Sequence, residues 1–174
     1  MKRLLRILLL SFFVFSNPAS SNEKLIDSLK EGGKLIFIRH AYAPGNGDPK
    51  NFNLKDCSSQ RNLSQEGINQ SKKIGLFFTK NKIKIDKVLS SEWCRCKDTA
   101  KYAFNDYKIF DALNSFYDVR FIKNKTNQIK DLKKYVSSWN SKKNLVLVTH
   151  FVVISETLNM GSTSGEIVVS DKNY

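Results

Sequence analysis

Only two histidines occur in the 174-residue chain, and each directly follows a run of apolar residues. His40 comes after residues 34–39 and His150 after residues 144–149, and both runs are typical of buried strands. In open parallel sheets, ligands bind beyond the carboxyl ends of the strands. The sequence therefore predicts that both imidazoles project into one binding region.

Arginine is used sparingly, with six arginines against 23 lysines. Arg39 precedes His40, Arg61 ends a long loop, and Arg95 opens a predicted helix, whereas Arg120 stands apart from these motifs. A planar guanidinium binds phosphate or carboxylate through two parallel hydrogen bonds, while lysine supplies only a point charge. The positions favour an anion site, and ordinary surface ion pairs are the alternative.

Two histidines with two or three arginines, and no evident set of metal ligands, are typical of phosphoryl-transfer chemistry. An imidazole nitrogen can attack phosphorus and form a covalent intermediate, while positioned cations stabilise the charge on the equatorial oxygens. The chain lacks the GxxxxGK[ST] phosphate loop, so nucleotide hydrolysis of that type is not expected. We expect no cofactor and no metal.

Strands alternate with helices over residues 22–174, which predicts an α/β fold. The expected architecture is a three-layer sandwich with a mostly parallel central sheet and helices on both faces. Strands are expected at residues 34–39, 87–90, about 109–110, 144–149 and 166–169. Helices are expected from Asn22 to the Gly32-Gly33 pair, from the Ser64 cap to about residue 78, at 93–104 and 129–139, and briefly after residue 150.

The start of the chain is typical of a secretory signal peptide. Basic residues precede an apolar run over residues 7–15, and small residues suited to cleavage lie just before Asn22. A membrane anchor is the alternative, but the apolar run is shorter than the roughly 20 residues that a spanning helix needs. We therefore expect a signal at residues 1–21 and one domain at residues 22–174, exported and in the periplasm.

Four motifs, in order between residues 35 and 150, resemble those of the histidine phosphatase superfamily, which is phosphoglycerate mutase-like. They are Arg39-His40-Ala41, Arg61-Asn62-Leu63-Ser64-x-x-Gly67, Ser91-x-x-x-Arg95-x-x-x-Thr99-Ala100 and Leu147-Val148-Thr149-His150. The resemblance implies a metal-independent phosphatase in which His40 is the phosphorylated nucleophile. It further implies that Arg39, Arg95 and His150 complete the phosphate pocket and that Arg61 adds a contact to the substrate.

One departure from the family concerns the proton donor. Many members carry a Glu in a Leu-x-Glu segment after the third motif, and this chain has Ser115 there. A general acid typically adds about 10²–10⁴ in rate. Asp118 and Asp48 are the candidates to replace it and to contact the substrate, unless the leaving group needs no acid, as with a phosphohistidine. For Asp48 the alternative is an ordinary turn residue.

The missing Glu leaves a second function open, a phosphate- or phospholipid-headgroup-binding protein with little or no turnover. The formal charge of +13 also admits a basic surface-binding protein. The lysines are dispersed, however, and no nucleic-acid-binding signature accompanies them, so no nucleic-acid partner is expected. The expected partner is a phosphorylated small-molecule or lipid-linked substrate; a membrane surface is compatible but not required. The oligomeric state is not indicated.

The three cysteines lie beside the arginine motifs. Cys57 precedes Arg61 by four residues, and Cys94 and Cys96 flank Arg95. If both arginines line one pocket, Cys57 lies near the other two, and an oxidising compartment would allow a disulfide. Because the segment around Cys94 resembles that of exported family members, the resemblance favours a Cys57–Cys94 bridge with Cys96 free. A three-cysteine zinc site is the alternative.

Overall fold

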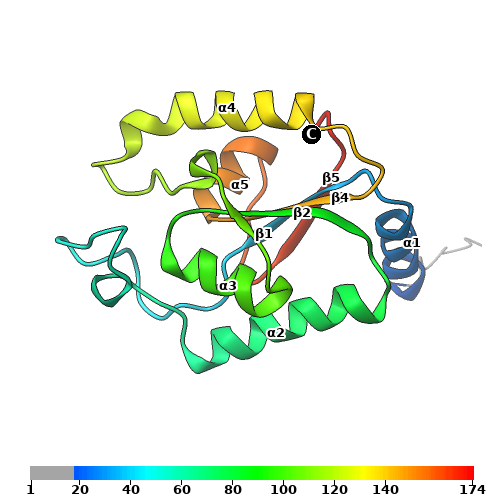
Figure 1. Ribbon diagram of the computed structural model, residues 1–174, viewed down its shortest axis with the longest axis horizontal. Helices are drawn as coiled ribbons and strands as arrows, with labels where there is room; N and C mark the ends of the chain where they lie inside the picture. The colour runs from blue at the N-terminus through cyan, green and yellow to red at the C-terminus, as the bar shows by residue number, and fades with distance from the viewer. Residues whose placement is uncertain (1–17) are drawn as a thin grey trace, which may run out of the picture.

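The computed structural model describes residues 18–174, which form a five-stranded sheet with helices on both faces (Figure 1). The strands are β1 (Leu35–Arg39), β2 (Ile85–Ser90), β3 (Lys108–Ile109), β4 (Asn144–Thr149) and β5 (Ile167–Ser170). The α-helices are α1 (Pro18–Glu31), α2 (Gln65–Lys80), α3 (Cys94–Phe104), α4 (Lys125–Ser138) and α5 (Phe151–Leu158), and three short 3-10 turns lie at Cys57–Ser59, Asp111–Leu113 and Ile122–Asn124.

The sheet has the order β3-β2-β4-β1-β5. All neighbouring strands are parallel except β5, which runs antiparallel to β1. Helices α1, α2 and α3 cover one face of the sheet, and α4 and α5 cover the other (Figure 1). The predicted α/β sandwich with a mostly parallel sheet is therefore confirmed.

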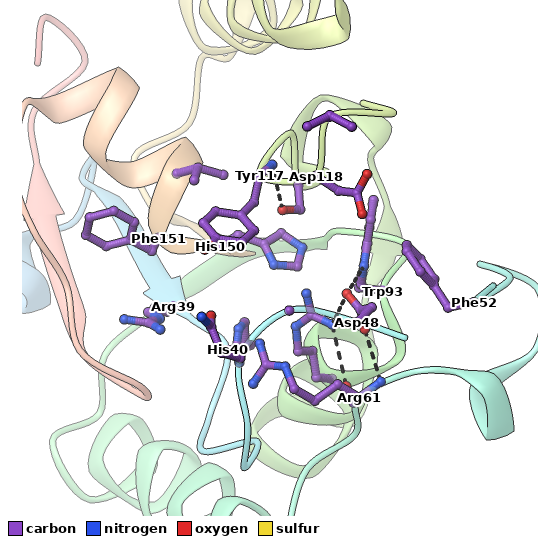
Figure 2. A pocket seen from close by; sticks show the side chains of 16 residues that line it. Arg39, His40, Asp48, Phe52, Arg61, Trp93, Tyr117, Asp118, His150 and Phe151 are labelled. Atoms are coloured by element: carbon purple, nitrogen blue, oxygen red, sulfur yellow. Dashed lines mark hydrogen bonds and ion pairs between the residues drawn. The ribbon is translucent and has the colours of Figure 1, made fainter. Parts of the chain in front are cut away.

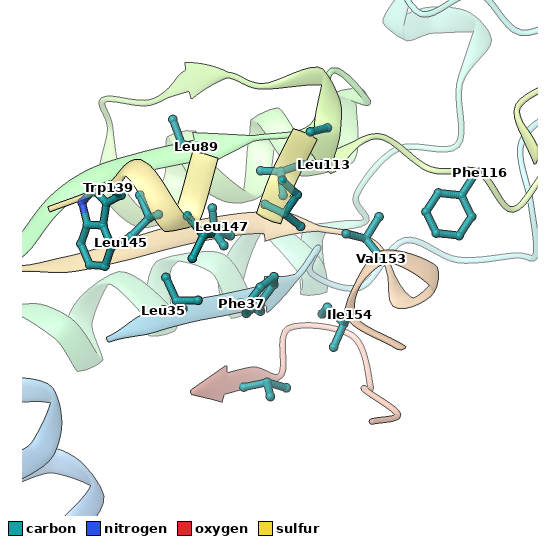
Figure 3. Packing of buried hydrophobic residues seen from close by; sticks show 14 residues of the cluster. Leu35, Phe37, Leu89, Leu113, Phe116, Trp139, Leu145, Leu147, Val153 and Ile154 are labelled. Atoms are coloured by element: carbon teal, nitrogen blue, oxygen red, sulfur yellow. The ribbon is translucent and has the colours of Figure 1, made fainter. Parts of the chain in front are cut away.

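The central strands are buried on both faces. On β1, Leu35 and Phe37 join the core beneath α4 and α5 (Figure 3), whereas Ile36 and Ile38 join the core beneath α1, α2 and α3. A strand covered on both sides has no solvent-facing positions, so its sequence is a continuous apolar run rather than an alternating one. This burial explains why β1 and β4 are the clearest strands in the sequence.

The first helix differs from its prediction. It begins at Pro18 instead of at an Asn22 cap, and it ends at Glu31. Proline is well tolerated in the first turn because its missing N–H has no helical partner there. After Glu31, Gly32 adopts a φ of +87°, and a Cβ there would lie 2.1 Å from the carbonyl oxygen of Lys142, so only glycine fits.

The other predicted elements are present, with ends shifted by a few residues. The predicted signal peptide, residues 1–21, lies outside the described part of the chain except for its last four residues, which open α1. Within residues 18–174, no helix has both the length and the apolar character needed to cross a membrane.

The close approach of α2 and α3 gives a test of the packing. A Cβ on Gly75 would lie 2.2 Å from the carbonyl oxygen of Ala103, so Gly75→Ala forces the two helices apart. We expect a net loss of about 1–3 kcal/mol in the free energy of unfolding, despite the roughly 1 kcal/mol that alanine gains over glycine in a helix. Urea denaturation measures this difference in the free energy of unfolding.

The matched control is Gly161→Ala, because nothing lies within 4 Å of a Cβ at that position. Its free energy of unfolding should stay within about 0.5 kcal/mol of the parent value. Equal stability of the two variants would show that the helices do not pack as closely as described.

Candidate active site

The two histidines follow neighbouring strands. β1 and β4 end in register, with Arg39 paired to Thr149, and the backbone N–H of His40 donates to the carbonyl of Thr149 at 2.9 Å. The His40 and His150 ring centroids are 5.5 Å apart, and each residue is only 3% exposed. Their position at adjacent strand ends thus brings both imidazoles into one region, as the sequence predicts.

A cavity of about 820 Å³ opens at this edge of the sheet (Figure 2). Its wall contains all seven residues singled out from the sequence, which are Arg39, His40, Asp48, Arg61, Arg95, Asp118 and His150. They come from β1, the long loop after it, α3, the segment before α4, and the end of β4. Residues far apart along the chain therefore meet around one space.

Arg39, Arg61 and Arg95 share one pattern of contacts. Each guanidinium is anchored through Nη1, while its Nε is buried and has no partner among the described residues. The anchors are the carbonyl of Ser162 for Arg39 at 2.5 Å, the carbonyl of Ala43 for Arg61 at 2.5 Å, and the carboxylate of Asp48 for Arg95 at 2.9 Å. Three guanidinium groups line one cavity and only that of Arg95 is paired with a carboxylate, which indicates a site for an anion.

The electrostatics of the site agree with this interpretation. Burial, followed by the positive charge of Arg95, lowers the pKa of Arg39 and of Arg61. Like charges held close together disfavour one another's charged form. An anion bound among the guanidinium groups would favour their charged forms. Anion binding would therefore relieve the repulsion among the three arginines.

Asp48 is part of a buried ion pair. Its carboxylate accepts from Arg95 Nη1 at 2.9 and 3.1 Å, from Trp93 Nε1 at 3.0 Å and from the backbone N–H of Arg61 at 3.0 Å. The side chains of Arg95 and Asp48 are 4% and 7% exposed. Asp48 is thus more than a turn residue: it orients Arg95, and its oxygens are engaged as acceptors, which disfavours the hypothesis that it supplies a proton.

His40 is held in one tautomer. Its Nδ1 lies 2.8 Å from the carbonyl oxygen of Ala41, which only accepts, so the proton is on Nδ1 and Nε2 carries the lone pair. Burial, followed by the charge of Arg95, lowers the pKa of His40 to about 3. The ring is therefore neutral near pH 7 and has a free nucleophilic nitrogen.

His150 is oriented by a chain of hydrogen bonds. Asn114 Oδ1 accepts from the backbone N–H of Glu92 at 2.9 Å and from the hydroxyl of Ser91 at 3.0 Å. Ser91 Oγ is then free to accept from His150 Nε2 at 2.9 Å. Burial is the main cause that lowers the pKa of His150 well below its ordinary value.

The second acid candidate, Asp118, is paired with Arg120. Arg120 donates Nε to Oδ1 at 2.9 Å and Nη2 to Oδ2 at 2.8 Å. These hydrogen bonds lower the pKa of Asp118 to about 2, so it holds no proton near neutral pH. Ser115, which replaces the family's Glu, is buried and its Oγ accepts from the backbone N–H of Tyr117 at 3.3 Å.

A disulfide joins Cys57 to Cys94, which confirms the favoured pairing. It ties the long loop after β1 to the first residue of α3 and so fixes Asp48 and Arg95 on linked segments. Cys96 is free and buried, and burial raises its pKa to about 12. The zinc alternative is wrong because two of its three sulfurs are bonded to each other. No cluster of three or more metal-ligating side chains occurs in residues 18–174.

Sequence reasoning missed several residues of the cavity and its surroundings. Ser91 lies in the third motif but was given no role, although its position directly after β2 matches those of His40 and His150 after their strands. Asn114 bonds Ser91 from a distant segment, and no local pattern marks it. Tyr117 and Phe151 line the cavity as exposed aromatics, which a single sequence does not distinguish from core residues.

No protein-family model matches the chain, and no curated protein matches it by sequence. Solved structures do match. The protein histidine phosphatase SixA complexed with tungstate aligns with a TM-score of 0.57 and 15% identity over 80% of this chain and 90% of that chain. The chain has the fold of the histidine phosphatase superfamily.

Two mycobacterial proteins show the same histidine phosphatase fold. Glucosyl-3-phosphoglycerate phosphatase Rv2419c, in complex with VO3, aligns with a TM-score of 0.58 and 13% identity over 79% of this chain and 92% of that chain. Rv3214 from Mycobacterium tuberculosis aligns with a TM-score of 0.58 and 13% identity over 78% and 89%. The fold expected from the resemblance of the four motifs is thus confirmed.

The Arg95–Asp48 pair gives a test of how the site is held. Asp48→Ala leaves a buried guanidinium without its carboxylate, which should lower the free energy of unfolding by about 3–5 kcal/mol. Asp118→Ala breaks a solvent-exposed pair and should cost much less stability than Asp48→Ala. Urea denaturation of both variants measures the two losses. Similar losses would mean that Asp48 is not buried against Arg95.

Neutral buried histidines predict a loss of stability in acid. The pKa of His40 is about 3 when folded and near 6.5 when unfolded, so the unfolded state binds more protons below pH 6.5. Stability is therefore lost as the pH falls from 6.5 towards 3. His40 alone should account for about 2 kcal/mol of the loss between pH 7.5 and pH 5.

The control variant for this pH dependence is His40→Gln, whose amide side chain cannot take up a proton. The drop in its free energy of unfolding between pH 7.5 and pH 5 should be smaller than that of the parent by about 2 kcal/mol. Identical drops in both proteins would contradict a neutral, buried His40.

Proposed function

We propose that this protein is an exported phosphatase of the histidine phosphatase superfamily, which hydrolyses phosphomonoesters or phosphohistidine through a covalent phosphohistidine at His40. The supporting observation is the set of three arginines that line the cavity beside both histidines, of which only Arg95 is paired with a carboxylate. Such donors suit the equatorial oxygens of a transferring phosphoryl group. Tungstate and VO3, bound in two structural relatives, are oxyanions of related chemistry.

His40 is the nucleophile in this proposal. With its proton held at Nδ1 by the Ala41 carbonyl, Nε2 offers its lone pair to phosphorus. As the Nε2–P bond forms, the bond from phosphorus to the leaving group breaks, and the leaving group departs with the electron pair. The resulting phosphohistidine keeps its Nδ1–H bonded to Ala41.

Water completes the reaction. Its oxygen bonds to phosphorus while the P–Nε2 bond breaks and returns its electron pair to His40. A water proton passes through solvent to the departed group, so the net change is ester plus water to alcohol plus inorganic phosphate. Arg39 and Arg95 hold the phosphoryl group, His150 lies beside it in the pocket, Arg61 adds a contact, and Asp48 positions Arg95.

The proposed reaction needs no metal ion. Guanidinium groups supply the positive charge that Mg²⁺ provides in many other phosphoryl-transfer sites. We place the enzyme in the periplasm, on the signal-like residues 1–21 and on the Cys57–Cys94 disulfide, because disulfides persist in oxidising compartments. Its substrate is a phosphorylated small molecule or a lipid-linked phosphate.

A phosphate-binding protein without turnover is the second candidate. The observation in its favour is that both carboxylates on the cavity wall, Asp48 and Asp118, are engaged as acceptors by arginines. Such a protein would bind inorganic phosphate in the cavity and form no covalent adduct.

The test is phosphate release from an aryl phosphate by the parent protein and by His40→Ala. We expect turnover by the parent, unchanged by EDTA, and a loss of several orders of magnitude in His40→Ala, because removing a nucleophile commonly costs about 10⁴ or more. Tyr102→Ala, an exposed aromatic away from the cavity, is the control and should keep full activity.

Chemical trapping distinguishes the two candidates. Incubation with a labelled phosphodonor should yield an acid-labile, base-stable adduct on His40. Phosphate binding without any adduct would favour the binding protein, and full activity of His40→Ala would refute the assignment of the nucleophile.

A further inference from the structure

One wall of the cavity is apolar and open. Tyr117, Val119 and Phe151 all line the cavity and are 62%, 84% and 42% exposed. Figure 2 shows Tyr117 and Phe151 on the side of the cavity where His150 lies. The Arg39 guanidinium carbon is 5.7 Å from the centroid of the Phe151 ring, so this wall adjoins the anion site directly.

Exposed apolar side chains gathered at a cavity mouth are typical of a ligand site. Large apolar groups scattered singly over a surface need no explanation, but a contiguous group beside polar, convergent donors marks the place where a ligand's apolar part is covered. The anion site takes the phosphate, so the apolar wall faces the group to which the phosphate is attached.

Two of the polar side chains that line the cavity, Ser115 and Asp118, are already bonded within the protein. Ser115 Oγ accepts from the backbone N–H of Tyr117, and Asp118 is bound through both carboxylate oxygens to Arg120. Asn46 is the remaining amide among the lining residues. A sugar, with several hydroxyl groups to satisfy, would find few partners here, because an unpaired hydroxyl removed from water is costly.

The same ion pairs constrain the chemistry of the leaving group. Both lining carboxylates are engaged as acceptors by arginines, Asp48 by Arg95 at 2.9 Å and Asp118 by Arg120 at 2.8 Å. A leaving group that departs without a proton from these residues must be stable as an anion. Aromatic alcohols meet this requirement far better than alkyl alcohols, because the ring delocalises the charge and lowers the pKa of the hydroxyl to about 10 in tyrosine.

We infer that the substrate is a phosphate ester of an aromatic alcohol, whose ring contacts Tyr117 and Phe151 while its phosphate binds among the three arginines. The inference rests on the proposed phosphatase function. The bond from phosphorus to the phenolic oxygen breaks as His40 attacks, the electron pair stays on the phenolate, and the phenolate takes its proton from solvent water. Aromatic pairs and the neighbouring Arg39 cation stabilise the ring in place.

The first experiment compares leaving groups. The parent protein is assayed with phenyl phosphates of graded leaving-group pKa, with glycerol phosphate as an alkyl ester, and with acetyl phosphate, whose leaving group is weakly basic but has no ring. We expect kcat/KM to fall steeply as the leaving-group pKa rises, and glycerol phosphate to be slower than phenyl phosphate by about 10²-fold or more, the usual size of the missing acid catalysis.

The second experiment tests the wall itself. Tyr117→Ala and Phe151→Ala should each raise KM for phenyl phosphate by about two- to tenfold, the usual range for one aromatic contact, with little change in kcat. KM for acetyl phosphate should stay the same, because its methyl group is too small to reach the wall. Tyr102→Ala is the matched control, an aromatic of 40% exposure outside the cavity, and should change neither value.

The outcomes separate this inference from the proposed function. Hydrolysis of glycerol phosphate as fast as phenyl phosphate, or unchanged KM values in both wall variants, would overturn the aromatic substrate while leaving the phosphatase intact. Release of phosphate from none of the substrates, acetyl phosphate included, would overturn the phosphatase and this inference with it.

Discussion

Three guanidinium groups carry like charges into one cavity, and the carboxylate of Asp48 offsets part of their repulsion. The pair that it forms with Arg95 is buried, so losing either partner would lower the free energy of unfolding by several kcal/mol. The excess positive charge of the three guanidinium groups favours an anion in the cavity.

The surrounding structure supplies the same kind of anchor to the other two arginines. Backbone carbonyls of Ser162 and Ala43 hold Nη1 of Arg39 and Arg61, and so orient both side chains without neutralising their charge. The sheet fixes the two histidines, since adjacent parallel strands end at one edge. The Cys57–Cys94 disulfide joins the loop that carries Asp48 to the helix that carries Arg95, so the parts of the site are connected covalently as well as by packing.

The sequence predicted the parts of the site that depend on single strands. β1 and β4 are continuous apolar runs, so their ends, and with them His40 and His150, could be located and expected to meet. The partners of Asp48 could not be found in this way, because Arg95 lies 47 positions along the chain and no local pattern encodes that contact. The apolar wall formed by Tyr117 and Phe151 could not be predicted either, because the solvent exposure of a side chain is a property of the folded chain.

The central claim is that one tetrahedral anion binds among Arg39, Arg61 and Arg95 beside the two histidines. A crystal structure of the protein soaked with tungstate tests it most directly. We expect one tungstate with oxygens within hydrogen-bond distance of the three guanidinium groups, and His40 Nε2 facing the tungsten atom. Tungstate bound elsewhere, or an empty cavity at millimolar tungstate, would contradict it.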